Sequence, residues 1–313
     1  MPQRILIVGS VALDDVTTPH GERRGILGGS AVYGSVAASN FAPVDIVGIV
    51  GDDFPVEHVR ALRARGVNTD GLEIVPGGKT FHWAGEYGGA MNEAVTHLTE
   101  LGVFEHFNPQ IPDAYRDDPY VFLANIDPEL QLRVLEQVAR PRLVVIDSMN
   151  LWINIKREAL LEALRRADAA LLNDAEACLL CQTHSLPHAA AELLKLGLGR
   201  AIIKKGSHGA QMFSAAGTFA VPALPLASVK DPTGAGDTFA GGLIGYLAMR
   251  DRLDEQTWRQ AILVGSACAS FVVEDFSIGR TAGLTPTQVL ESCNRLHAAI
   301  TCEPVRILDA PRD

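Results

Sequence analysis

The sequence of 313 residues lacks any apolar run of the roughly 18 residues that a membrane-spanning helix needs. Its first apolar run, residues 4–8, is too short for a secretion signal and leads to no small-residue cleavage site. Cysteine is also scarce, and an odd total of five argues against a disulfide framework. We therefore expect a protein of the reducing cytoplasm. The one close pair, Cys178 and Cys181, lies in an apolar helical stretch and predicts core thiols rather than zinc ligands.

An excess of positive charge is absent as well. Lysine and arginine number 27 against 37 aspartates and glutamates, a formal net charge of −10. This balance disfavours nucleic acid and membrane surfaces as partners, although a local site can still be positive and bind a phosphorylated ligand. Hydrophobic residues make up 47%, which indicates a folded globular chain.

Two common nucleotide-binding motifs are missing. The sequence contains no G-x-x-x-x-G-K-[ST] string, which disfavours a P-loop NTPase. After the first predicted strand Gly9 stands alone, without the G-x-G-x-x-G fingerprint of dinucleotide-binding folds.

Short runs rich in Val and Ile alternate with helical patterns. We predict strands at residues 5–8, 44–50, 120–124, 143–146, 169–172 and 201–204. Helices are predicted between them, at residues 30–40, 56–65, 129–139, 157–166, 175–181 and 189–196. The strands are continuously apolar, which indicates burial on both faces. The pattern predicts a mostly parallel sheet between two layers of helices, with ligands at the carboxyl ends of its strands.

Two stretches interrupt this alternation. Residues 72–107 contain short β-like runs and paired glycines, and residues 17–27 form a polar excursion. We predict a single domain over residues 1–313, with a small β-sheet lid contributed by about 15–27 and 72–107. Three helices are expected after that, at residues 237–249, 255–273 and 286–300.

The most informative segment is the string D-P-T-G-A-G-D-T-F-A-G-G at residues 231–242. Its glycines let the backbone approach a ligand, and the amides at the start of the following helix attract anions. Asp237 lies in the first turn, where a carboxylate can take a proton from an attacking hydroxyl. Taken alone, a G-x-G-D string is also compatible with a simple helix cap.

The full string resembles the carboxyl-terminal signature of the ribokinase-like (PfkB) carbohydrate kinase family. The resemblance implies a three-layer α/β/α fold, ATP and Mg²⁺ as cofactors, and Asp237 as the catalytic base. It also implies an anion hole formed by Gly234, Ala235 and Gly236. In many members a monovalent cation such as K⁺ binds nearby, so Asp231 and Thr233 are candidate ligands for it.

The resemblance extends to the amino-terminal segments. Asp14 follows the first strand and inherits the family's role of binding substrate hydroxyls, with a turn-capping aspartate as the alternative and Asp15 as a weaker candidate. Gly28 and Gly29, followed by Ser30 at the start of the next helix, resemble the family's glycine pair, whose backbone packs against the substrate. The family often has Asn where Tyr33 stands, so the substrate contacts of this loop can differ.

Three further segments resemble the family's nucleotide site. Asn173 and Glu176 match the element that holds Mg²⁺ through water, although they also have the form of a helix capping box. Lys204 or Lys205 is a candidate phosphate ligand, with a solvated lysine pair as the alternative. Gly206 and Gly209 are expected to let the backbone approach ATP. Asp147 and Asn150 are weaker candidates, because their spacing departs from the family pattern and its arginine is absent.

These features predict an ATP-dependent phosphotransferase that moves the γ-phosphoryl group of MgATP to a hydroxyl of a sugar or similar polyol. The alternatives are a nucleoside kinase of the same fold and a catalytically silent protein that binds a sugar or nucleotide. Phe81, His82 and Trp83 in the predicted lid are expected either to stack on the substrate or to form an interface. Because a β-sheet lid with an apolar face needs a partner, we expect a homodimer formed through the lid.

Overall fold

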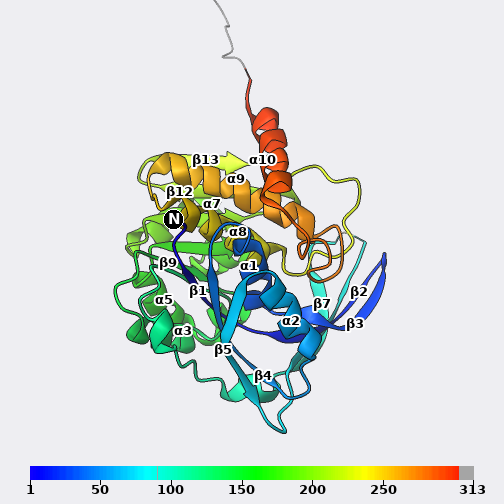
Figure 1. The fold of residues 1–313 in the computed structure, drawn as a ribbon. Helices are drawn as coiled ribbons and strands as arrows, with labels where there is room; N and C mark the ends of the chain where they lie inside the picture. The colour runs from blue at the N-terminus through cyan, green and yellow to red at the C-terminus, as the bar shows by residue number, and fades with distance from the viewer. Residues whose placement is uncertain (90, 303–313) are drawn as a thin grey trace, which may run out of the picture.

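The computed structural model describes residues 1–89 and 91–302, and these residues form a large and a small sheet (Figure 1). The large sheet has the strand order β13-β12-β11-β10-β9-β8-β1-β4-β5. Its strands are parallel from β5 to β11, and β12 and β13 are antiparallel. The strand bounds are Ile5–Val8 (β1), Val44–Gly51 (β4), Val67–Val75 (β5), Tyr120–Leu123 (β8), Leu143–Asp147 (β9), Ala169–Asn173 (β10), Arg200–Lys204 (β11), Ala210–Ser214 (β12) and Gly217–Val221 (β13).

Helices cover both faces of this sheet. Figure 1 shows helices on either side of its strands. Alternate residues of β1 belong to two cores: Ile5 and Ile7 pack with α1, α8 and α9, whereas Leu6 and Val8 pack with α3, α5 and α7. The helix bounds are Ser30–Ala38 (α1), Val56–Ala64 (α2), Pro128–Gln137 (α3), Asn150–Ile155 (α4), Arg157–Arg165 (α5), Asp174–Leu180 (α6), Leu186–Lys195 (α7), Ala235–Arg250 (α8), Glu255–Val272 (α9) and Pro286–Ile300 (α10). The predicted three-layer α/β/α arrangement is therefore confirmed.

The helices and the cysteines bear on two further expectations from the sequence. None of the helices described here is long and apolar enough to cross a membrane. The cysteines are free thiols, of which Cys268 is buried and Cys178 and Cys181 are half-buried.

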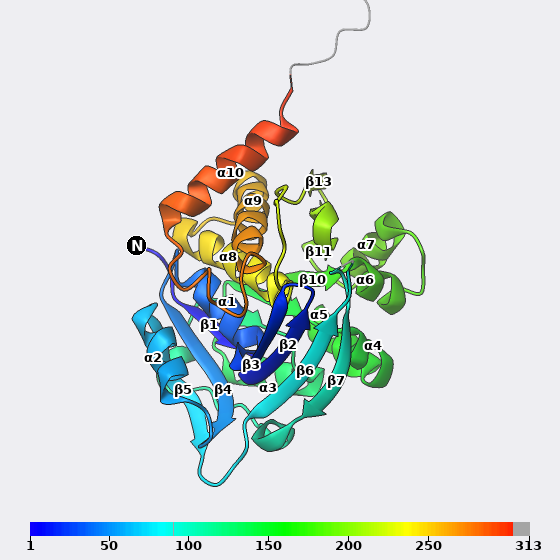
Figure 2. The ribbon, with the colours of Figure 1, turned by 90° about the vertical axis from the view of Figure 1, so that its right-hand side faces the viewer.

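The small sheet has the strand order β3-β2-β6-β7 (Figure 2). Its strands are Ala12–Thr18 (β2), Gly21–Gly28 (β3), Phe81–Tyr87 (β6) and Ala94–Glu100 (β7). Its bounds differ from the expected segments, because it begins at Ala12 and because Leu72–Val75 pair with β4 in the large sheet. A short 3₁₀ turn, Gly102–His106, follows β7. Whether this sheet moves as a lid remains a prediction.

Glycines allow α1 and α8 to approach backbone to backbone. A Cβ placed on Gly241 would lie 2.1 Å from the carbonyl oxygen of Gly34, and one on Gly245 would lie 2.9 Å from the Cα of Ala38. On its other side α8 meets α9, where a Cβ on Gly242 would lie 2.8 Å from the sulfur of Cys268. This close packing brings the amino ends of α1 and α8 to the same place.

The contact between the two helices predicts the effect of a small substitution. In a helix interior Gly→Ala usually stabilises by about 1 kcal/mol, but Gly241→Ala has no room for its methyl group. We expect the free energy of unfolding to fall by about 1–3 kcal/mol, the usual penalty of overpacking. Urea unfolding of the variant measures this change. Gly283→Ala, in a turn where no heavy atom lies within 4 Å of the new Cβ, controls for adding a methyl group without crowding. A stabilised Gly241→Ala protein would contradict the packing.

Candidate active site

Polar residues meet where three neighbouring parallel strands end. Asp147, Asn173 and Lys204 are the last residues of β9, β10 and β11. Asn173 lies opposite Lys204 in the register, and Asp147 lies opposite Leu171. Because the carboxyl ends of parallel strands share one edge of the sheet, the register alone places these side chains together.

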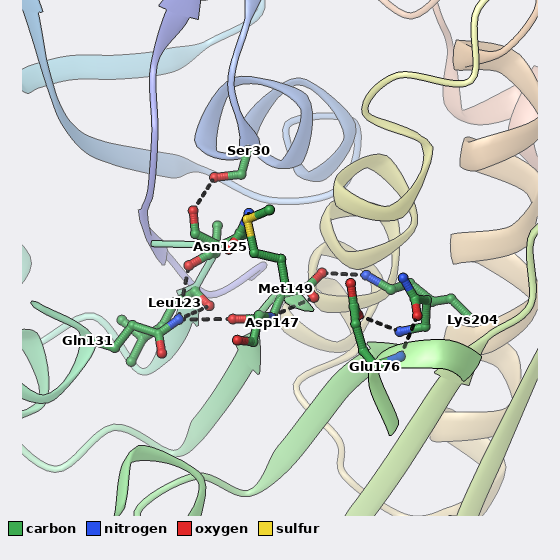
Figure 3. A network of polar contacts seen from close by, with 11 residues as sticks. Ser30, Leu123, Asn125, Gln131, Asp147, Met149, Glu176 and Lys204 are labelled. Atoms are coloured by element: carbon green, nitrogen blue, oxygen red, sulfur yellow. Dashed lines mark hydrogen bonds and ion pairs between the residues drawn. The ribbon is translucent and has the colours of Figure 1, made fainter. Parts of the chain in front are cut away.

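Lys204 is the positive centre of this group (Figure 3). Its Nζ lies 2.5 Å from Oδ2 of Asp147, and its side chain is only 17% exposed. Burial lowers the pKa of Lys204, but the charges of Asp147, Glu176 and Asp237 more than offset this, so the pKa is raised and the ammonium stays charged. Of the two lysines considered, Lys204 is thus the one that faces the acidic cluster.

Asp237 lies in the first turn of α8, directly after Gly236. A Cβ on Gly236 would lie 3.0 Å from Nζ of Lys204, so the lysine approaches the bare backbone at this point. Burial raises the pKa of Asp237 to about 7; the charge of Asp147 adds to this effect and Lys204 opposes it. A carboxylate with such a pKa is a suitable general base near neutral pH.

The three residues Gly234–Gly236, here called the anion turn, begin α8. Gly234 has φ 73°, a left-handed conformation that favours glycine, and a Cβ there would lie 2.4 Å from the ring of Tyr33. The amide of Ala235 donates to the carbonyl oxygen of Pro232 at 3.2 Å, so it is already used within the turn. The amides of the next residues are those that a helix start leaves for an anion.

Asp14 lies on β2 and is 4% exposed. A Cβ on Gly28 would lie 2.0 Å from its Oδ2, so the absence of a side chain at Gly28 makes room for the carboxylate. Burial, followed by the charges of Asp231, Asp237 and Asp15, raises the pKa of Asp14 to about 8. The structure therefore brings the two predicted key carboxylates, Asp14 and Asp237, to one site from opposite ends of the chain.

Gly29 and Ser30 hold the loop before α1. Gly29 has φ 100°, and a Cβ there would lie 2.4 Å from the carbonyl oxygen of Ser10. The Ser30 hydroxyl lies 3.1 Å from that of Ser10 and donates to the carbonyl oxygen of Asn125 at 3.3 Å (Figure 3). In this structure Ser30 therefore joins two loops of the site.

Asp231 and Thr233 precede the anion turn. Oδ1 of Asp231 accepts a hydrogen bond from the amide of Thr233 at 2.9 Å, whereas its Oδ2 is buried without a hydrogen-bond partner. Burial raises the pKa of Asp231. Thr233 and the backbone of Ser277 lower this pKa, and a buried carboxylate of this kind is compatible with the expected K⁺.

Asn173 and Glu176 form the capping box that was considered as the alternative. The Glu176 amide donates to Oδ1 of Asn173, and the Asn173 amide donates to Oε2 of Glu176, both at 2.7 Å. Burial raises the pKa of Glu176 to about 7, and Lys204 opposes this rise. Within residues 1–89 and 91–302 no group of three or more acidic, His or Cys side chains is arranged around a metal position. Asn173 and Glu176 supply oxygen donors, the ligand type compatible with Mg²⁺ that keeps most of its waters.

Gly206 and Gly209 form the turn between β11 and β12, both with positive φ, 52° and 86°. A Cβ on Gly209 would lie 2.0 Å from the carbonyl oxygen of Val221, so this glycine is required by packing against β13. At Gly206 no heavy atom lies within 4 Å of such a Cβ. Only Gly206 therefore has an open side for a ligand.

Two residues beside the site, Asn125 and Gln131, were not predicted from the sequence. Asn125 accepts from Nε1 of Trp152 at 3.0 Å and donates to the sulfur of Met149 at 3.1 Å (Figure 3). Gln131 is fully buried and donates to the carbonyl oxygen of Asp147 at 2.9 Å. Asn125 comes just after a buried strand, and this position could have marked it in the sequence. No such pattern marks Gln131. Asn150 begins α4 and is exposed.

Comparisons with known proteins identify the family and the fold. A family model described as pfkB family carbohydrate kinase matches residues 23–282. A cytidine kinase from Thermococcus kodakarensis is 33% identical over 251 residues, which cover 77% of this chain and 88% of that protein. The structure of a Methanocaldococcus jannaschii nucleoside kinase, an archaeal member of the ribokinase family, has a TM-score of 0.76 at 22% identity and covers 94% of this chain and 98% of that one. A putative ribokinase II from E. coli in complex with ATP and Mg²⁺ has a TM-score of 0.77 at 18% identity, over 94% and 99% of the two chains.

The buried carboxyl of Asp14 predicts a pH-dependent stability. Its folded-state pKa of about 8 lies far above the unfolded value of about 3.9. The folded protein therefore binds this proton more tightly, and stability falls as pH rises from about 4 to about 8. Since each pKa unit corresponds to about 1.4 kcal/mol, Asp14→Asn should lose less stability than the wild type between pH 5 and pH 8, by a few kcal/mol.

Urea unfolding at the two pH values measures this difference. Asp117→Asn, at an exposed aspartate, controls for the general effect of removing one negative charge. An identical loss of stability in wild type and Asp14→Asn would show that Asp14 is not buried as an acid.

Proposed function

The chain belongs to the pfkB family of carbohydrate kinases, and from this premise we propose that it transfers the γ-phosphoryl group of ATP to a ribose hydroxyl of a nucleoside. One observation carries the proposal. Asp237, with a pKa near neutrality, lies in the first turn of α8, where the backbone of Gly236 faces the ammonium of Lys204. A base, a cation and a helix start thus converge on one point, as phosphoryl transfer requires.

The acceptor hydroxyl lies between Asp14 and Asp237 in this proposal. Asp14 holds neighbouring hydroxyls of the sugar, and Asp237 takes the proton of the reacting hydroxyl. The freed oxygen forms a bond to the γ-phosphorus while the bond from that phosphorus to the β–γ bridging oxygen breaks, and ADP leaves. The amide of Gly236, which follows the occupied amide of Ala235 at the start of α8, stabilises the negative charge on the transferring group.

The nucleotide occupies the edge formed by β10 and β11. Lys204 contacts the phosphates of ATP, and Gly206 lets the protein backbone approach the nucleotide. Asn173 and Glu176 would hold Mg²⁺ through water. Mg²⁺ held there would neutralise phosphate charge and so reduce repulsion toward the incoming hydroxyl. Asp231 and Thr233 would hold K⁺, whose charge would offset that of Asp231 in the loop before the anion turn.

A nucleoside is preferred over a free sugar, the reverse of the order in the sequence-based prediction. The cytidine kinase and the nucleoside kinase compared above support this choice. The structure adds an aromatic side chain, because Trp83 on β6 lies opposite Asp14 on β2 in the small sheet. The indole of Trp83 lies against Gly85 and donates to Oγ1 of Thr96 at 3.3 Å. We infer that the base of a nucleoside held at Asp14 would extend toward this indole.

The rate of phosphoryl transfer should depend on the carboxylate of Asp237. Asp237→Asn should lower kcat by about 10²- to 10⁴-fold, the usual contribution of a general base, while ATP still binds. In the wild type the base must be ionised, so kcat/KM should rise as pH increases through about 7. ADP formation with cytidine, uridine, adenosine, inosine, ribose and fructose as acceptors measures both effects.

Asp117→Asn is the control for this experiment and should keep wild-type activity. Turnover with free sugars alone would reject the nucleoside and keep the kinase. Tight binding of an acceptor with no ATP consumption would instead identify a silent binding protein.

The expected homodimer and the lid motion are also proposals. The edge strand β7 exposes Val95 (63%) and Leu98 (37%), an apolar surface suited to a second copy of the small sheet. Val95→Asp should therefore shift the protein from dimer to monomer in light scattering after size-exclusion chromatography. Thr96→Val, on the same strand, should leave the mass unchanged, and a monomeric wild type would refute the dimer.

A further inference from the structure

The hairpin of β6 and β7 is attached at its base by aromatic stacking. The ring of Phe81, the first residue of β6, lies 5.4 Å from that of Phe104, which in turn lies 5.6 Å from Phe107. Phe107 belongs to a core of the large sheet. Phe81 is therefore occupied in packing and is not available to stack on a substrate, and the base of the hairpin is a fixed point.

The far end of β6 reaches the anion turn. Tyr87 is the last residue of this strand, and its hydroxyl accepts a hydrogen bond from Oγ1 of Thr233 at 3.2 Å. Among the described residues of the hairpin, the other side-chain hydrogen bonds and ion pairs stay inside the small sheet: His82 with Asp15 and Glu100, Trp83 with Thr96, and Glu86 with His97. The contact of Tyr87 is thus the polar side-chain link from this part of the hairpin to the loop before α8.

Thr233 is well placed to transmit the position of Tyr87. Its amide is held by Asp231 at 2.9 Å and its hydroxyl by Tyr87, so two different groups of the residue are fixed. The next residue, Gly234, makes the left-handed turn that rests on the ring of Tyr33. A rotation at Thr233 would therefore tilt the peptide groups that begin α8 and carry Asp237.

The surroundings keep this hydrogen bond neutral. Burial raises the pKa of Tyr87 to about 12, an effect that the hydrogen bond from Thr233 opposes and the charge of Asp231 reinforces. The phenol therefore remains protonated at neutral pH. Because it accepts from Thr233, its own proton remains able to donate to an oxygen of a bound ligand.

We propose that Tyr87 is a positioning residue that couples the small sheet to the anion turn through Thr233. When the small sheet is in this position, Tyr87 fixes the turn in the orientation that serves Asp237. The inference rests on the proposed function, because the orientation matters through phosphoryl transfer. It assigns no proton transfer to Tyr87 itself.

A double-mutant cycle tests the coupling. Tyr87→Phe should lower kcat about tenfold, which corresponds to about 1.4 kcal/mol, with KM for ATP and acceptor changed less than about threefold, because the turn acts on the transition state. Thr233→Val should have a similar effect. The double variant should then also lose about tenfold, rather than the hundredfold of independent sites. Multiplicative losses, or a Tyr87→Phe enzyme with wild-type kcat, would overturn the proposal.

His97→Ala is the control, because it removes an exposed imidazole that bonds Glu86 within the same hairpin and that has no part in the proposed site. It should keep kcat within about twofold, since surface changes of this kind are nearly neutral. A loss equal to that of Tyr87→Phe would show that general loosening of the hairpin explains both and would overturn the proposal.

A second measurement does not depend on turnover. Binding of Mg²⁺ with a non-hydrolysable ATP analogue should slow amide hydrogen exchange in β6 and β7 of the wild type. In Tyr87→Phe the analogue should still bind but should no longer protect these strands, and equal protection in both proteins would refute the coupling. If the wild type phosphorylates no acceptor, the proposed function fails, and this exchange result alone decides the coupling.

Discussion

The close approach of α1 and α8 is the contact on which the site depends. With hydrogen atoms in place of side chains at Gly34 and Gly241, two helix backbones touch, and an added methyl group would overlap a carbonyl oxygen. Both helices therefore begin at the same edge of the large sheet. The loop that precedes α1 contains Gly28, whose bare backbone makes room for Asp14, and the turn that precedes α8 leads to Asp237. Residues more than two hundred positions apart thus share one site.

Unfavourable electrostatics follow from this convergence. Asp14, Glu176 and Asp237 all have raised pKa values, chiefly because each is removed from water. One ammonium, that of Lys204, opposes the rise at Glu176 and Asp237. A bound cation and a polar substrate would supply partners for these three carboxylates. The ionised carboxylates are therefore more stable in the complex than in the free protein. A loss of folding stability of this kind is typical of functional sites.

Much of the fold and some of the site were predictable from local pattern. Continuous apolar runs predicted the strands β1, β4, β8, β9, β10 and β11, and the glycine-rich string predicted the start of α8. The small sheet was located less well. Leu72–Val75 are paired in the large sheet, and β2 begins at Ala12, because strand partners are chosen by register over long distances rather than by composition. The same limit hid Gln131, whose amide reaches three carbonyl groups at strand ends.

The sequence by itself determined the alternation of strands and helices, the family resemblance and the residue types needed for phosphoryl transfer. These properties depend on side-chain polarity and spacing along the chain, which are local. The tertiary structure decided that Lys204 faces the acidic cluster, that Tyr33 supports Gly234, that Phe81 is used in packing, and that Tyr87 meets Thr233. Each of these facts is a distance between residues remote in the chain. Such distances are set by helix packing and sheet register, which only the folded molecule defines.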